Sequence, residues 1–250
     1  MASVASPSSP TSSSSSSSPL IVADGVSRTY HLGASAVPAV RGVTLSVARG
    51  EFVALRGPSG SGKTTLLNLM GLLDSPDDGA GRVVVEGRDA RSLTENDRSD
   101  LRRDRFGFVF QTFNLIPVLT SEENVSYPMV LAGVAAAERR RRARGLLQSV
   151  GLSGKEEVRP DLLSGGQRQR VAIARALANE PAVVFADEPT ANLDSHTSEE
   201  ILDLMREINA ARGVAFLFAT HDPVVVARAR RVVTLHDGAV ASDVAASGAP

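Results

Sequence analysis

The stretch GPSGSGKTT, residues 57–65, decides how the rest of the chain is organised. It follows EFVALR, which has the composition of a short strand, and it leads into KTTLLNLMGLL, where apolar residues recur at helical spacing. Glycines here let the backbone curl so that successive N–H groups face inward, and the following helix adds the positive end of its dipole. A strand, a glycine-rich turn and a helix in this order predict a phosphate-binding loop.

Every residue of this loop is a candidate contact to a nucleotide. Lys63 is expected to reach the β- and γ-phosphates, and the Thr64 hydroxyl is expected to ligate Mg²⁺. The alternative is a turn that only joins a strand to a helix, but the Lys-Thr pair at this spacing argues against it. The predicted nucleotide-binding residues of the loop are Gly57, Pro58, Ser59, Gly60, Ser61, Gly62, Lys63, Thr64 and Thr65.

The composition indicates one globular unit, since 42% of the 250 residues are apolar. The longest apolar runs are far shorter than the roughly 20 residues that cross a bilayer. With 27 basic and 28 acidic side chains the net charge is −1, so no nucleic-acid partner is expected. The chain has no cysteine, which excludes disulfides and thiolate nucleophiles.

The chain divides into a domain and two tails. Residues 1–19 are rich in Ser and Pro and are expected to be disordered, with an organelle transit peptide as the less favoured alternative. Residues 20–240 should form the folded domain, and residues 241–250 a flexible tail. Between about 92 and 170 the sequence turns helical and arginine-rich, which predicts an inserted helical subdomain.

Outside the insert, apolar strands alternate with helices. Residues 20–32, 42–47, 51–57 and 81–87 have strand patterns, AVVFAD and VAFLFAT are continuous apolar strands, and a helix is expected over about 195–211. Continuous apolar strands are typical of parallel sheets covered on both faces. The pattern predicts an α/β fold with a parallel sheet, a small antiparallel β subdomain and the helical insert.

The apolar run AVVFAD ends in an acidic pair. Asp187 is placed to hold Mg²⁺ directly or through water, and Glu188 is placed as the general base for a hydrolytic water. The alternative is that Asp-Glu-Pro caps the helix that begins near Ser195.

Three further side chains are candidates by position. His221 ends a buried strand, where ligands of open α/β sheets collect, although a lone histidine is more often structural. Gln111 follows FGFVF and is expected to ligate Mg²⁺ or hold the water; the alternative is a surface glutamine. Tyr30 is one of only two tyrosines and is expected to stack on adenine; the alternative is an ordinary core or surface tyrosine.

A second glycine turn stands roughly 100 residues downstream, in LLSGGQRQR. The N–H groups and the serine hydroxyl at such a helix start can bind phosphate. Because the turn should lie at the tip of the insert, we expect it to bind the nucleotide of a second copy in a two-fold dimer. Its candidate contacts are Ser164, Gly165, Gly166 and Gln167, and Asp194 is expected along the dimer seam.

These motifs together resemble the ATP-binding cassette (ABC) ATPases over about residues 20–240. Residues 57–65 match the family's Walker A, 163–167 its signature, and 183–187 with Glu188 its Walker B. Gln111, Asp194, His221 and Tyr30 match its Q-loop, D-loop, switch histidine and aromatic A-loop. The resemblance implies a P-loop NTPase (RecA-like) core that binds ATP and Mg²⁺ and hydrolyses ATP.

Within the family, GFVFQTFNLIPVLTSEENV, LMGLLDSPDDG and ADEPTANLD are similar to the lipoprotein-releasing and macrolide-export group (LolD- and MacB-like). This similarity implies a homodimer, a separate integral membrane permease, and a place on the cytoplasmic face of a bacterial membrane through that permease. The closest alternative is an FtsE-like cell-division ATPase that transmits force without transport. A chromosome-structuring ATPase would need a long coiled coil between the motifs, and a translation factor would normally carry two cassettes.

Three segments keep open interpretations. FNLIPVL, residues 113–119, is either a docking surface for the permease or ordinary subdomain core. The arginine run 139–144 is expected to be a solvated helix face, with a contact to anionic lipid as the alternative. Arg56 stands before Walker A where the family usually has an apolar or small residue, and the sequence offers no reason for it.

Overall fold

The computed structural model describes residues 19–33 and 35–245. Six strands form a mainly parallel sheet in the order β10-β9-β3-β8-β7-β6. Strand β10 is antiparallel to β9, and the other pairs are parallel. The bounds are β3 Phe52–Arg56, β6 Phe106–Val109, β7 Val183–Asp187, β8 Ala215–Thr220, β9 Arg231–His236 and β10 Ala239–Ala245.

Side chains of the central strands alternate between two cores. In β8, Leu217 packs toward α1 (Lys63–Met70) while Phe216 and Phe218 pack toward the helices of the opposite face. Strand β7 divides in the same way, with Phe185 on the first face. Because the sheet is buried on both faces, its strands have the continuous apolar runs seen in the sequence.

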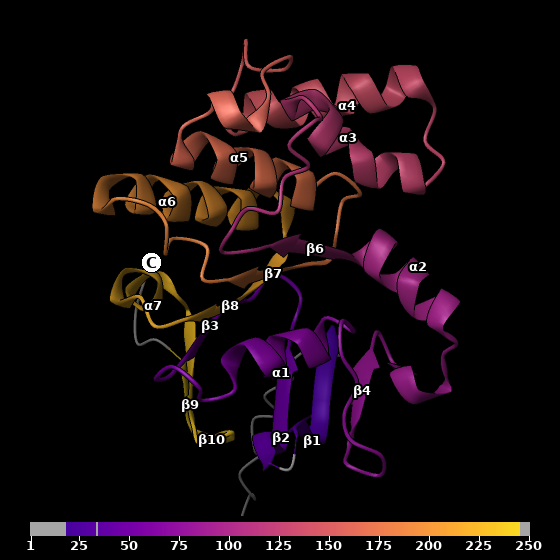
Figure 1. Cartoon of the computed structure of the whole chain (residues 1–250), viewed down its shortest axis with the longest axis vertical. Coiled ribbons are helices and arrows are strands. Elements are labelled where there is room, and N and C mark those ends of the chain that lie inside the picture. The colour runs from indigo at the N-terminus through magenta and orange to yellow at the C-terminus, as the bar shows by residue number, and fades with distance from the viewer. Residues whose placement is uncertain (1–18, 34, 246–250) are drawn as a thin grey trace, which may run out of the picture.

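The second sheet has four antiparallel strands in the order β2-β1-β4-β5. Their bounds are β1 Ile21–Leu32, β2 Ser35–Val47, β4 Arg82–Val85 and β5 Arg88–Asp89. Its apolar residues share one core with α1 and the near face of the central sheet. Helix α1 therefore lies between the two sheets (Figure 1), which fixes the helix that starts at the end of the phosphate-binding loop.

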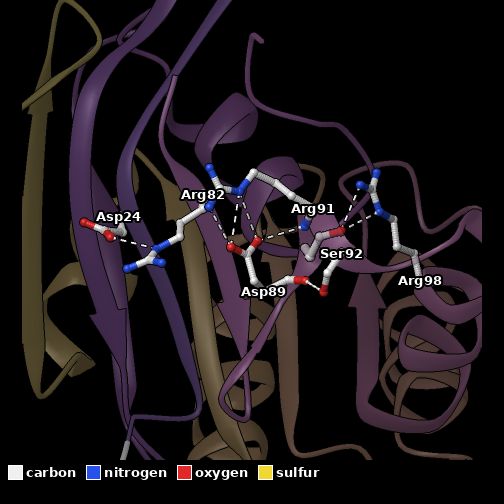
Figure 2. A network of polar contacts seen from close by, with 7 residues as sticks. Asp24, Arg82, Asp89, Arg91, Ser92 and Arg98 are labelled. Atoms are coloured by element: carbon white, nitrogen blue, oxygen red, sulfur yellow. Dashed lines mark hydrogen bonds and ion pairs between the residues drawn. The ribbon is translucent and has the colours of Figure 1, made fainter. Parts of the chain in front are cut away.

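A polar network ties the edge of the four-stranded sheet to the next helix (Figure 2). Arg82 pairs with Asp24 at 3.0 Å, while Asp89 accepts from Arg91 at the start of the short helix η1 (Ala90–Ser92). Arg98, on α2 (Glu95–Arg105), donates to the carbonyl of Ala90 at 2.9 Å. The network holds α2 against the sheet although this helix buries only one leucine.

Further helices cover the other face of the central sheet. Helices α3, α4 and α5 stack at the end of the molecule away from the four-stranded sheet, and α6 and α7 lie nearer the strands (Figure 1). Their bounds are α3 Ser121–Leu131, α4 Ala136–Ser149, α5 Gly165–Ala176, α6 Ser195–Arg212 and α7 Pro223–Arg228, with the short helix η2 Pro160–Leu162 before α5.

The α/β fold class with its two sheets is confirmed. Two predicted boundaries differ in the structure. The segment predicted as a helical insert, residues 92–170, also contains β6, which becomes a strand because it pairs with β7 as the edge of the central sheet. The flexible tail predicted for 241–250 begins with β10 residues, because β9 offers them backbone partners and Arg231 pairs with Asp243 at 2.7 Å.

Residues 1–18 of the predicted N-terminal tail and residues 246–250 of the predicted C-terminal tail lie outside the described part of the chain. Of the N-terminal tail, the structure describes only Pro19. Among the described helices, none combines the length and the apolar content that a membrane crossing requires.

Candidate active site

The carboxyl ends of β3, β7 and β8 meet at one edge of the central sheet, because these neighbouring strands are parallel. An open cleft of about 480 Å³ lies there. It brings together eight residues, all of which were predicted from the sequence: Pro58, Ser59, Gly60, Lys63, Thr64, Gln111, Glu188 and His221.

The glycines of the loop are needed for close approach. A Cβ on Gly57 would lie 2.3 Å from the carbonyl oxygen of Leu235, and one on Gly62 would lie 2.2 Å from that of Ala39. Gly62 also has a φ of 95° as the residue that starts α1. No larger residue fits at either position without moving backbone, so the loop conformation depends on both glycines.

Lys63 lies across the loop and is 7% exposed. Its Nζ donates to the carbonyl oxygens of Gly57 and Pro58, each at 2.9 Å. These contacts hold the positive charge of Lys63 against the loop.

The side chains of Thr64 and Asp187 are joined by a hydrogen bond. The Thr64 hydroxyl donates to Oδ1 of Asp187 at 2.9 Å, which joins the start of α1 to the end of β7. Burial raises the pKa of the Asp187 carboxyl above its usual value, and the neighbouring Glu188 adds to that increase, while Thr64 and Lys63 oppose it. Two oxygen donors with an unfavourable buried charge are suited to a hard divalent cation.

Glu188 is held from several directions. Its φ is 45°, in the left-handed region that non-glycine residues rarely adopt. Oε2 accepts from the Thr220 hydroxyl at 3.0 Å, and Oε1 lies 2.6 Å from Nδ1 of His221. The carboxylate is 16% exposed and the imidazole 70% exposed. The carboxylate is therefore fixed at the wall of the cleft, beside a ring that solvent reaches.

The sequence did not single out the residues that support this wall. Thr220 binds Glu188, Thr190 donates to Asp222 at 2.7 Å, and the buried Gln169 of α5 donates to the carbonyl of Pro189 at 2.7 Å. Thr220 and Thr190 are polar residues beside catalytic candidates, but only their burial in the fold distinguishes them from surface threonines.

Gln111 reaches the cleft from the loop after β6. Its side chain lines the cleft and is exposed, and its backbone carbonyl accepts a hydrogen bond from the Asn192 side chain at 2.8 Å. Asn192 was not predicted as a functional residue. Through this bond the loop after β6 is connected to the segment that follows Glu188.

Tyr30 is placed beside the cleft and does not line it. It lies on β1, its hydroxyl donates to Asp74 at 2.8 Å, and the Arg28 guanidinium covers one ring face at 5.1 Å. Burial raises the pKa of the Tyr30 hydroxyl, the bond to Asp74 adds to that increase, and the Thr65 hydroxyl opposes it. The ring is therefore locked next to the end of the phosphate-binding loop.

The turn of residues 164–167, which we call the signature turn, starts α5 with a capping box. The Ser164 hydroxyl accepts from the N–H of Gln167 at 3.3 Å, and the Gln167 side chain accepts from the N–H of Ser164 at 3.1 Å. A Cβ on Gly166 would lie 2.5 Å from the Thr197 methyl group, and one on Gly165 would touch Leu193. The glycines thus have a packing role in addition to the predicted phosphate contact.

Asp194 caps α6, and its side chain accepts from the N–H and the hydroxyl of Thr197 at 2.9 and 2.6 Å. These bonds lower the pKa of the Asp194 carboxyl. Among the described residues that line the cleft, none belongs to the signature turn or is Asp194. One chain therefore brings together the phosphate-binding loop and the acidic wall, but it does not bring the signature turn to them.

A family model described as "ABC transporter" matches residues 40–191, which is more than half of the chain. The chain belongs to the ABC transporter family, and it is an ATP-binding, ATP-hydrolysing cassette of that family.

Two relatives show the range of lengths in which this cassette occurs. The chain is 49% identical over 227 residues to the macrolide export ATP-binding/permease protein MacB of Chromobacterium violaceum, covering 91% of this chain and 34% of that protein. It is 47% identical over 215 residues to an uncharacterized ABC transporter ATP-binding protein of Thermotoga maritima, covering 86% of this chain and 91% of the relative. The chain thus spans about a third of the length of the MacB relatives it matches.

The fold is similar to a solved dimeric cassette, MJ0796, with a TM-score of 0.84 and 41% identity over 92% of this chain and all of that one. A second structure of MJ0796 is described as a post-hydrolysis dimer bound to ADP and Pi, with a TM-score of 0.83. These comparisons support an ABC transporter cassette and do not favour the FtsE-like alternative.

Proposed function

We propose that this cassette works as a head-to-tail homodimer that encloses two MgATP and drives an integral membrane permease of the macrolide-export type. The observation that carries the proposal is the incomplete cleft: it holds Lys63, Thr64 and Glu188, whereas the signature turn of the same chain lies elsewhere. A two-fold pair can complete both sites at once, since each chain supplies what its partner lacks. The dimeric state described for MJ0796 supports this arrangement.

The phosphate chain of ATP is proposed to bind along the loop of residues 57–65. Lys63 then exchanges the carbonyls of Gly57 and Pro58 for β- and γ-phosphate oxygens. Tyr30 offers adenine the ring face that Arg28 does not cover. From the partner chain, Ser164, Gly165, Gly166 and Gln167 meet the γ-phosphate, and Asp194 lies along the seam between the two sites.

The residues at the end of β7 fit Mg²⁺. The Thr64 hydroxyl, the Asp187 carboxylate and the Gln111 amide oxygen are all hard oxygen donors, which is the ligand type that Mg²⁺ prefers. When bound there, Mg²⁺ neutralises charge that develops on the phosphate oxygens.

Glu188 is proposed as the general base. Its carboxylate removes a proton from the water that attacks the γ-phosphorus, while the phosphorus–oxygen bond to ADP breaks. Thr220 and His221 hold the carboxylate in place, and His221 is exposed enough to contact the γ-phosphate as well. After hydrolysis the signature turn loses its γ-phosphate contact, so the two chains separate.

The permease is proposed to bind a groove of about 360 Å³ beside the loop after β6. Apolar side chains of this groove are partly exposed, with Tyr127 43% and Leu131 60% accessible. Arg102, Arg103 and Arg175 also line it. An apolar helix is complementary to the exposed apolar side chains of this groove. This partner would place the cassette on the cytoplasmic face of a bacterial membrane.

The test is complementation between two inactive variants. Lys63→Ala removes the loop cation, and Ser164→Arg fills the signature turn. A mixed dimer then keeps one intact site, built from the loop of the Ser164→Arg chain and the turn of the Lys63→Ala chain. An equal mixture should recover about a quarter of the wild-type ATPase rate, since half of the dimers are mixed and each has one working site.

Each variant alone should be inactive, and the formation of mixed dimers is verified by co-purification of differently tagged chains. If mixed dimers form and hydrolyse no ATP, the two parts do not act across the interface.

A further inference from the structure

The loop between Gln111 and α3 contains a strained corner. Phe113 and Asn114 have φ values of 61° and 48°, so two consecutive residues with side chains occupy the left-handed region. Neither is glycine, and such a conformation persists only when its surroundings hold it. We call these two residues the 113–114 corner.

Two arginines of helix α5 contact this corner. The Arg175 guanidinium donates to the carbonyl of Phe113 at 2.7 Å and also to the carbonyl of Asn114. The guanidinium of Arg168 lies over the Phe113 ring, 5.2 Å from its centre. Arg168 and Arg175 are seven residues apart, about two helical turns, so they project from the same side of α5.

The hydrogen bonds of the Arg175 side chain go to the 113–114 corner. It is half-buried, and burial lowers the pKa of its guanidinium. Within the described part of the chain its partners are backbone carbonyls, and no carboxylate forms an ion pair with it. A buried charge is costly unless it is bonded, so the two carbonyls and the guanidinium depend on one another.

The corner lies between the cleft proposed for the nucleotide and the groove proposed for the permease. Two residues before it, Gln111 lines the cleft, and its own carbonyl is held by Asn192. Asn114 and Arg175 line the groove proposed for the permease. A movement of the corner therefore changes the groove and the position of Gln111 together.

We infer that Arg168 and Arg175 are positioning residues that clamp the 113–114 corner onto α5 and thereby fix where Gln111 stands in the cleft. The inference deepens the proposed function and rests on it for the role of Gln111. Helix α5, which begins with the signature turn, thus also fixes the position of the proposed metal ligand Gln111 in the cleft of its own chain. Because Gln111 is proposed to hold Mg²⁺ at the reacting phosphate and does not contact the adenine base, loss of the clamp should lower kcat and leave KM for ATP nearly unchanged.

The test compares MgATP hydrolysis by the purified wild-type chain and three variants. Arg175→Met removes the hydrogen-bond donors and keeps most of the side-chain volume. Since the strained corner then loses the bonds that hold it, we expect kcat to fall about tenfold and KM to stay within about twofold of the wild type. Arg175→Lys can bond one carbonyl but lacks the guanidinium fork, so its kcat should be intermediate.

The matched control is Arg170→Met. Arg170 lies on the same helix, donates to the carbonyl of Val150 at 3.0 Å and pairs with Glu200 at 3.0 Å, but it does not contact the corner. Its kcat should stay within about twofold of the wild type. Equal losses in Arg170→Met and Arg175→Met, or a wild-type kcat in a folded Arg175→Met chain, would overturn the inference.

If Arg175→Met does not fold, Arg168→Met serves instead, because it removes only the contact to the ring. A drop in kcat of about two- to fivefold is expected from the loss of a cation–π contact, and an unchanged kcat would overturn the inference.

Hydrogen exchange separates this inference from the proposed function. In Arg175→Met, amides of residues 111–116 should exchange faster than in the wild type and in Arg170→Met, while amides within α3 and α5 stay protected. This result is expected whether or not the wild-type chain hydrolyses ATP. A wild-type chain without ATPase activity contradicts the proposed function, whereas unchanged exchange at 111–116 contradicts the clamp.

Discussion

Glu188, the proposed general base, is held in place by its backbone conformation and by two side-chain contacts. Its left-handed backbone directs the side chain to the cleft wall, and Thr220 and His221 each hold one carboxylate oxygen. The sequence predicts the acidic residue at the end of an apolar strand. It cannot predict the strained φ or the two bonds, because both depend on β8 lying beside β7.

Glu188→Gln is the direct test at this scale. The amide keeps the size and one acceptor oxygen but cannot take a proton from water, so the ATPase rate should fall at least about 100-fold. Affinity for MgATP, measured by equilibrium titration with a fluorescent analogue, should change less than about twofold, since the loop of residues 57–65 is untouched. A variant that turns over at the wild-type rate would exclude Glu188 as the base.

Arg56 is a residue that neither the sequence nor the structure explains. Its side chain is exposed at the end of β3, and within residues 19–33 and 35–245 it forms no hydrogen bond or ion pair. By contrast, the arginine run 139–144 has partners: Arg144 and Arg140 pair with Glu122, and Arg141 pairs with Glu138. These pairs are compatible with the predicted solvated helix face.

At the scale of elements, α5 joins several parts of the molecule. It starts with the capping box of the signature turn, contacts Thr197 through Gly166, bonds Pro189 through Gln169 and holds the 113–114 corner. The helix and its N-terminal turn are predictable from the sequence by the serine start and the apolar periodicity. Its contacts to other elements are not, because they depend on how α5 lies against α6 and the loop after β6.

Gly166→Ala tests the contact between α5 and α6. The new methyl group would lie 2.5 Å from the Thr197 methyl, and Thr197 cannot easily rotate because its hydroxyl is bonded to Asp194. Gly145→Ala is the control, since Gly145 is exposed within α4 and has no atom within 4 Å of a new Cβ. Both variants replace a helical glycine with alanine, so their difference reports mainly on the contact to Thr197.

Gly145→Ala should raise the free energy of unfolding by about 0.5–1 kcal/mol. Gly166→Ala should have a free energy of unfolding lower than that of Gly145→Ala by about 1–3 kcal/mol, because overpacking opposes the propensity gain. Urea unfolding followed by circular dichroism measures both values. Equal stabilisation of the two variants would show that the signature turn has room for a side chain.

Strand β6 shows the limit of local patterns at the same scale. The run FGFV has a strand-like apolar pattern, but it is short and lies in an arginine-rich, mostly helical segment, so the strand with which it pairs cannot be predicted from the sequence. In the structure it pairs with β7, and Gly107 allows the carbonyl of Ala176 in α5 to come close. Strand β6 therefore interrupts the segment predicted as a helical insert.

At the scale of the whole molecule, two cores share one central sheet. One core contains α1 and the four-stranded sheet, and the other contains the helices that include α5. The cleft lies at the carboxyl ends of the central strands, and the groove lies beside the loop that leaves β6. The sequence predicts this architecture because strand and helix patterns alternate strongly. The groove could not be outlined from FNLIPVL alone, since it is built mainly from β6, α2, α3 and α5.

The central claim is that two copies of this chain enclose ATP between the loop of one and the signature turn of the other. The most direct measurement is the molar mass of the Glu188→Gln chain in solution, by light scattering, with and without saturating MgATP. The mass should double when MgATP is added, and the double variant Glu188→Gln with Ser164→Arg should stay monomeric while it still binds ATP. A Glu188→Gln chain that binds MgATP and remains monomeric at every concentration measured would contradict the account.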